Sequence, residues 1–153
     1  MRRFLALFAA AAVTAVLLTA VSAGSALAAP GTWLTRVNNY RAANGRVRLA
    51  EDLQASQVAQ QWTKQMAANN KLAHNPSYSS QVTTSWYRIG ENVGYGGSEA
   101  TLFQAFVNSA GHRANLLLPE YNRVGIGQVI VNGRLWTTHI FIATRTATVA
   151  PAA

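Results

Sequence analysis

The chain has 153 residues with 13 basic side chains, 5 acidic side chains and no cysteine, and its formal net charge is +8. This length predicts a single domain, and the lack of cysteine excludes a fold held by disulfides, so a hydrophobic core must stabilise it. The basic residues are scattered rather than clustered among aromatic residues, so nucleic acid is not an expected partner. They are interpreted first as solvated surface, and second as an attraction to anionic cell-wall polymers or lipid headgroups.

Residues 1–28 are typical of a Sec-type signal peptide. Arg2-Arg3 precede an apolar run over residues 4–21, and Ala26-Leu27-Ala28 has the small residues of an A-x-A cleavage site. We expect cleavage before Ala29, a secreted, extracellular protein and no stable membrane span after cleavage. The alternative is an uncleaved anchor, because the apolar run is nearly long enough to span a bilayer. The absence of cysteine and of an unblocked Asn-x-Ser/Thr sequon favours a bacterial protein.

Helical patterns fill the first half of the domain. A helix is predicted over residues 33–44, ending before Gly45, and an extended link follows over residues 46–50. Glu51-Asp52 place negative charge at the start of a second helix that reaches about Asn70. The side chains predicted to form the buried face of this helix are Leu53, Ala55, Ala59, Trp62 and Met66.

The second half changes from loops and short helices to strands. We expect a long surface loop over residues 75–88 and a glycine-rich segment over 89–97 that either turns tightly or approaches another segment closely. Ser98 is the expected N-cap of a helix to Asn108 that buries Leu102, Phe103 and Phe106, and Ser109 begins a short helix through Leu117. Strands over 124–131 and 135–143 flank a type I′ turn at Asn132-Gly133. Helices first and strands last predict an α+β domain over residues 29–144, followed by a disordered tail over 145–153.

Three polar residues are the candidates for chemistry. His74 follows the second helix, Glu91 lies in the glycine-rich segment, and His112 lies in the first turn of the short helix. Two imidazoles and a carboxylate are suitable metal ligands, or an acid/base set without a metal, with Glu91 as the candidate catalytic group. Asn92 and Asn115 are expected to orient them by hydrogen bonding. The spacing matches no local zinc signature, so isolated structural histidines remain an equal alternative.

Five motifs in order resemble a bacterial CAP domain, the SCP-like superfamily of cysteine-rich secretory proteins, antigen 5 and pathogenesis-related 1 proteins. They are Val37-Asn38-Asn39-Tyr40-Arg41, Leu72-Ala73-His74, Gly90-Glu91-Asn92-Val93, residues 108–117 around Gly111-His112, and Val124-Gly125-Ile126-Gly127. The resemblance covers residues 33–144.

The resemblance implies an α-β-α sandwich, with a central antiparallel sheet between helical layers and a large cleft. In the family the cleft holds two histidines and two acids, and the histidines can take zinc or another divalent metal. His74, His112 and Glu91 match three of these positions. Ser109 stands near the position of the family's second acid, so that acid is missing here. His139, in the last predicted strand with Thr137 and Phe141 on its face, is expected to pack on the sheet or lie at the cleft rim, with cleft lining as the lesser alternative.

Three functions are compatible with this pattern. The favoured one is a secreted binding protein whose His/Glu cleft holds a lipid, sterol or cell-envelope component, and in addition a divalent metal that is not required. The alternative is a metal-dependent or acid/base hydrolase, peptidase-like, using Glu91 in the same cleft. The third is a structural protein whose polar residues only support the glycine-rich segment. The missing second acid makes us expect binding rather than catalysis.

Overall fold

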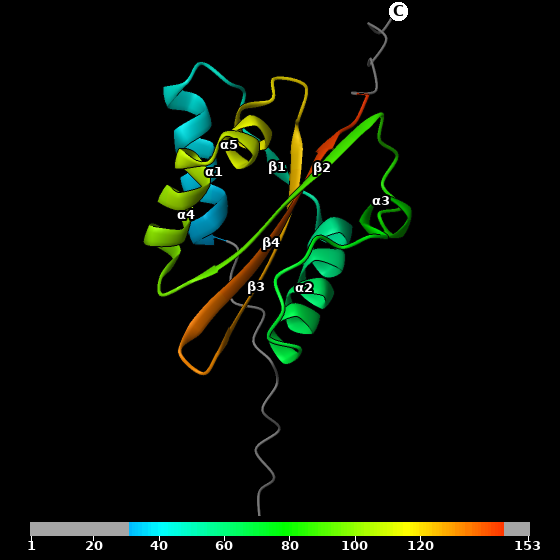
Figure 1. Ribbon diagram of the computed structural model, residues 1–153. Coiled ribbons are helices and arrows are strands. Elements are labelled where there is room, and N and C mark those ends of the chain that lie inside the picture. The colour runs from blue at the N-terminus through cyan, green and yellow to red at the C-terminus, as the bar shows by residue number, and fades with distance from the viewer. Residues whose placement is uncertain (1–30, 146–153) are drawn as a thin grey trace, which may run out of the picture.

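The computed structural model describes residues 31–145, and of Gly31 and Thr32 only the backbone. One sheet lies between two helical layers (Figure 1). One face carries α1 (Gly31–Ala43), α4 (Glu99–Asn108) and α5 (Ala110–Leu117), and the other carries α2 (Leu53–Ala68) and α3 (Tyr78–Gln81). This confirms the α+β sandwich expected from the sequence. The predicted signal peptide (residues 1–28) and residues 146–153 of the predicted tail lie outside the described residues.

The helices α1, α2, α4 and α5 begin and end close to the predicted positions, whereas α3 lies in the segment predicted to be a loop. Asp52 caps α2 by accepting a hydrogen bond from the Ala55 amide at 3.0 Å, and Ser98 caps α4 by accepting from the Thr101 amide at 3.2 Å. Ser109 is the N-cap residue of α5 by position, but its side chain makes no capping hydrogen bond.

The sheet has the strand order β1-β3-β4-β2. Its long strands β2 (Arg88–Gly96), β3 (Arg123–Val131) and β4 (Arg134–Ala143) pair antiparallel, and the two-residue β1 (Ala50–Glu51) adds parallel to β3. The sheet is therefore mixed rather than purely antiparallel. Asn132 and Gly133 both have positive φ, of 51° and 72°, as the predicted type I′ turn requires.

The glycine-rich segment is an edge strand rather than a tight turn. Gly90, Asn92 and Gly94 alternate along β2 toward the α4–α5 layer, whereas Glu91 and Val93 point to the other face. A Cβ on Gly90 would lie 2.3 Å from the Tyr121 hydroxyl, and one on Gly94 would lie 2.8 Å from the Phe106 ring. The glycines thus permit the close approach that was the other sequence-based alternative.

Two further expectations are corrected by packing. Leu53, predicted to be buried, is 71% exposed in the first turn of α2, and the buried face consists of Ala55, Val58, Ala59, Thr63, Met66 and Ala67. The predicted surface loop over 75–88 contains the short helix α3, buries Asn75 and Val82, and ends where β2 begins. It is consequently part of the wall that faces α2, since Val82 packs with Ala55, Val58 and Ala59.

Candidate functional site

Glu91 and His74 form a hydrogen-bonded pair at the edge of the sheet. The Nδ1 atom of His74 lies 2.7 Å from Oε1 of Glu91, and the Asn75 amide donates to the same oxygen at 3.0 Å. The Glu91 side chain is only 1% exposed, whereas that of His74 is 65% exposed. Burial raises the pKa of Glu91, and the hydrogen bonds from His74 and the Asn75 amide oppose this rise. The pair is therefore suited to holding a proton between a buried carboxyl group and a solvent-facing imidazole.

An amide network fixes the other side of the strand. Asn92 donates to the His112 carbonyl at 3.0 Å, and Asn115 donates to the Glu91 carbonyl at 3.1 Å and to Oδ1 of Asn92 at 2.9 Å. Because Asn92 is fully buried, this network attaches α5 rigidly to β2. The two asparagines hold the backbone that carries Glu91 and His112 rather than the charged atoms themselves.

His112 lies against Phe106, with their ring centroids 4.7 Å apart. Burial and the nearby His74 lower the pKa of His112, and a backbone hydrogen bond with Val93 partly opposes them. At neutral pH this imidazole is therefore uncharged, the form that accepts a hydrogen bond or binds a metal. Its Nδ1 atom is buried and has no partner within residues 31–145, and the same holds for Oε2 of Glu91.

The predicted site residues, apart from His139, line one pocket of ≈ 340 Å³. Its lining residues are His74, Glu91, Asn92, Ser109, Gly111, His112 and Asn115. The pocket sits at the edge strand, which His74 reaches from the α2 side and His112 from the α5 side. Ser109 occupies the position where the resemblance implied a second acid, so Glu91 is the one carboxylate among these lining residues.

His139 belongs to the core rather than to the rim of the pocket. It is fully buried on β4, with its ring centroid 4.6 Å from that of Trp33 and 5.4 Å from that of Phe106. Thr137 and Phe141 share its face, as the two-residue repeat of a strand predicted. Burial and, secondarily, His112 lower the pKa of His139 to about 3. Of the sequence-based alternatives for His139, the structure thus shows packing on the sheet rather than a place at the rim or in the lining of the pocket.

Sequence analysis missed two residues that support the site. Asn75 was placed in a surface loop, yet its amide holds Glu91 and its side chain donates to Gln81 Oε1 at 2.8 Å. Its position next to Pro76, which restricts the backbone, was the available signal. Arg41 was counted with solvated surface charge but is fully buried, with its guanidinium hydrogen-bonded to backbone carbonyls in the last turn of α5 and just after it.

Helical layers around one sheet, with a His/Glu pocket at its edge strand, define an α-β-α sandwich domain of the SCP-like class. The family model described as "CAP: Cysteine-rich secretory protein family" matches residues 34–140, and the chain belongs to this family. It is 30% identical to the uncharacterized protein YkwD of Bacillus subtilis (strain 168) in an alignment of 128 positions that covers 78% of this chain and 49% of YkwD. The chain thus spans about half the length of this curated relative.

Solved structures of similar fold include bacterial proteins. An extracellular protein containing a SCP domain from Bacillus anthracis str. Ames superposes with a TM-score of 0.62 at 28% identity, over 71% of this chain and 38% of that one. An outer surface protein of Borrelia burgdorferi gives a TM-score of 0.68 at 14% identity, over 74% of this chain and 90% of that one, and shows the fold alone. Among the described residues, no helix is long and apolar enough to cross a membrane.

Proposed function

We propose that this CAP protein is exported by a bacterium and that its His74–Glu91–His112 pocket binds a polar component of the cell envelope. The observation that carries the proposal is a pair of buried atoms, Oε2 of Glu91 and Nδ1 of His112, that have no hydrogen-bond partner among residues 31–145. Unpaired buried polar atoms cost free energy, so binding is favoured for a ligand that offers a donor to Glu91 and a hydrogen-bond partner to His112.

The lining favours a polar ligand over a lipid tail or a sterol. The side chains facing the pocket are imidazole, carboxyl, amide and hydroxyl groups, together with one glycine. Pockets for sterols and lipid tails bury apolar surface against apolar side chains, and this lining supplies none. Export is supported by the signal-peptide pattern of residues 1–28 and by the extracellular relative from Bacillus anthracis.

A divalent metal in the pocket remains a secondary proposal. Within residues 31–145, no group of three His, Cys, Asp or Glu side chains is placed to hold a metal ion, so the residues do not fit a three-ligand site as arranged. Oε1 of Glu91 is already engaged by His74. Elemental analysis of the purified protein and of a His74→Ala variant tests this directly, and stoichiometric zinc lost on substitution would support metal binding.

Binding is tested with insoluble peptidoglycan sacculi and, separately, with anionic phospholipid vesicles. We expect the protein to sediment with sacculi and not with vesicles. A Glu91→Gln variant replaces an acceptor oxygen with a donor and should weaken the association about tenfold. The matched variant Glu120→Gln, at an exposed carboxylate paired with Arg88, should bind like the unchanged protein. Sedimentation with vesicles only, or an equal effect of both substitutions, would contradict the proposal.

The alternative function is acid/base hydrolysis in the same pocket. It is favoured by one observation: Glu91, whose pKa is raised, is hydrogen-bonded to the solvent-exposed imidazole of His74. This contact gives the buried carboxyl group a route for proton transfer to and from water. Digestion of sacculi, measured as the release of soluble fragments, would establish hydrolysis if the activity disappeared in Glu91→Gln and persisted in Glu120→Gln.

A further inference from the structure

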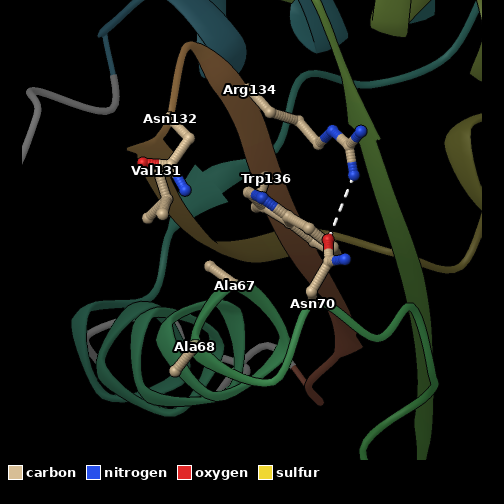
Figure 2. Close-up of a pocket in the computed structure, with 7 residues that line it drawn as sticks. All are labelled: Ala67, Ala68, Asn70, Val131, Asn132, Arg134 and Trp136. Atoms are coloured by element: carbon tan, nitrogen blue, oxygen red, sulfur yellow. Dashed lines mark hydrogen bonds between the residues drawn. The ribbon is translucent and has the colours of Figure 1, made fainter.

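A second pocket, of ≈ 440 Å³, lies where the β3–β4 hairpin meets the C-terminal end of α2 (Figure 2). Its apolar lining consists of the small side chains of Ala67, Ala68 and Val131, and the ring of Trp136 forms its inner side. Asn70, Asn132 and Arg134 add polar groups around it. It shares no lining residue with the pocket around Glu91.

The indole of Trp136 carries a donor without an acceptor. Its side chain is buried, with 2% exposure, and within residues 31–145 its Nε1–H donates to no protein atom, whereas those of Trp33 and Trp62 each donate at 2.8 Å. An indole N–H can only donate. Figure 2 shows this nitrogen on the side of the ring that faces Ala67 and Val131, which is the side of the pocket.

Arg134 is held in place beside this donor. Its Nη1 donates to Oδ1 of Asn70 at 3.1 Å, and its guanidinium carbon lies 4.7 Å from the centroid of Tyr95 and 5.9 Å from that of Trp136. Stacking on the aromatic rings and one hydrogen bond fix the plane of the guanidinium, so its remaining N–H groups form an ordered rim.

The charge around the pocket favours a neutral ligand over an anion. The pocket adjoins the last turn of α2, where the helix dipole places partial negative charge. Arg134 offsets this charge locally rather than creating a strongly positive surface. A ligand that fits must therefore offer a neutral acceptor to the Trp136 N–H and a small apolar group to the alanine and valine walls.

An acetamido group has both parts, since its carbonyl oxygen accepts a hydrogen bond and its methyl group is apolar. We propose that this pocket binds the N-acetyl group of an amino sugar. The carbonyl accepts from Nε1 of Trp136, and the methyl contacts Ala67, Ala68 and Val131. The sugar hydroxyls, which donate and accept, then reach Asn70, Asn132 and Arg134, a rim that suits a glycan better than the apolar side chains of a peptide.

The test is titration of the ¹⁵N-labelled protein with tri-N-acetylchitotriose, followed by NMR. The Trp136 indole signal, assigned as the one missing from a Trp136→Phe variant, should move in a saturable way while the other three indole signals stay in place. Cellotriose, which carries a hydroxyl in place of each acetamido group, should leave all of them unchanged. Glu91→Gln should bind the trisaccharide like the unchanged protein, because the two pockets share no residue.

A second variant keeps the test independent of the buried tryptophan. Ala68 is exposed on α2, so Ala68→Leu places a larger side chain in the apolar part of the second pocket without disturbing the core. Affinity for the trisaccharide should therefore fall about tenfold. Ala100→Leu, at an exposed alanine on α4, is the matched control and should have no effect. Equal responses to cellotriose, equal effects of the two leucine variants, or tighter binding of N-acetylalanine methylamide than of the trisaccharide would each overturn the proposal.

Discussion

Arg41 shows how one side chain can secure several chain segments. It extends from α1, is fully buried, and donates four hydrogen bonds to backbone carbonyls. The acceptors are the carbonyl oxygens of Val47, Leu116, Leu118 and Tyr121, at 2.8, 2.8, 3.1 and 3.0 Å. Burial and the neighbouring charge of Arg46 lower the pKa of Arg41, but a guanidinium keeps its proton at any pH at which the protein is folded.

Replacing Arg41 should therefore be costly. In Arg41→Met the apolar stem is retained, but carbonyls at the end of α5 and before β3 lose their donor. We expect the free energy of unfolding to fall by about 3 kcal/mol or more, because hydrogen bonds from a charged group are lost and buried acceptors remain unpaired. Urea unfolding measures the change. Arg123→Met, at an exposed arginine, is the control, and equal losses in both variants would contradict this role.

At the scale of elements, the packing of β3 on α2 depends on two glycines. A Cβ on Gly125 would lie 2.2 Å from the carbonyl carbon of Ala55, and one on Gly127 would lie 2.3 Å from the Gln60 amide. These neighbours are backbone atoms of α2, which cannot rotate away. Among the helix–strand pairs of the described domain, α2 and β3 share the most extensive contact, so the strand and helix approach as closely as their backbones allow.

Gly125→Ala should consequently separate α2 from the sheet. We expect a loss of about 3 kcal/mol in unfolding free energy, at the upper end of what overpacking costs in a core, because the obstacle is backbone rather than a movable side chain. Thermal unfolding followed by circular dichroism measures it. Gly97→Ala is the matched control, since nothing lies within 4 Å of a Cβ there and its φ is not in the left-handed region. A neutral Gly125→Ala would show that the helix shifts freely.

The elements that could be predicted from sequence are those whose pattern is local. Asp52 and Ser98 mark helix starts, and Asn132-Gly133 marks the hairpin turn, because caps and turns depend on residues a few positions apart. The strand β2 was missed because its glycines are explained by side chains of other elements, among them Tyr121 and Phe106, which are distant in sequence. A pattern of glycines indicates that another element packs closely against the backbone, but it does not identify that element.

The candidate site likewise has features that could be predicted from the sequence and features that could not. The ordered motifs predicted that His74, Glu91 and His112 come together, and the structure places all three in one pocket. The hydrogen bond from the Asn75 amide, the burial of His139 and the mixed sheet are tertiary outcomes with no local signal. Arg41 illustrates the limit of prediction from sequence, because an arginine on a helix is interpreted as surface charge unless its carbonyl partners are known.

At the scale of the whole molecule, stability is linked to pH through buried groups on both faces of the sheet. His139 lies in the α1–α4–α5 core among Trp33, Phe106 and Phe141, and His112 is the charged or titratable group that acts on it. The pKa values of His139 and His112 are both lowered on folding, so the unfolded chain binds their protons more tightly. The raised pKa of Glu91 acts in the opposite direction above pH 4.5, because there the folded chain binds the extra proton.

The imidazoles make the protein less stable as pH falls. An unfolded histidine protonates near pH 6.5, whereas folded His139 stays neutral down to about 3, so between these values its contribution declines by up to about 1.4 kcal/mol per pH unit. His139→Gln removes this titration, and between pH 7 and pH 4.5 the variant should lose about 2 kcal/mol less unfolding free energy than the unchanged protein. Urea unfolding at both pH values measures the two differences, so any effect of glutamine at pH 7 cancels. Parallel pH dependences would show that His139 is protonated in the folded core, which its lack of partners for either ring nitrogen within residues 31–145 argues against.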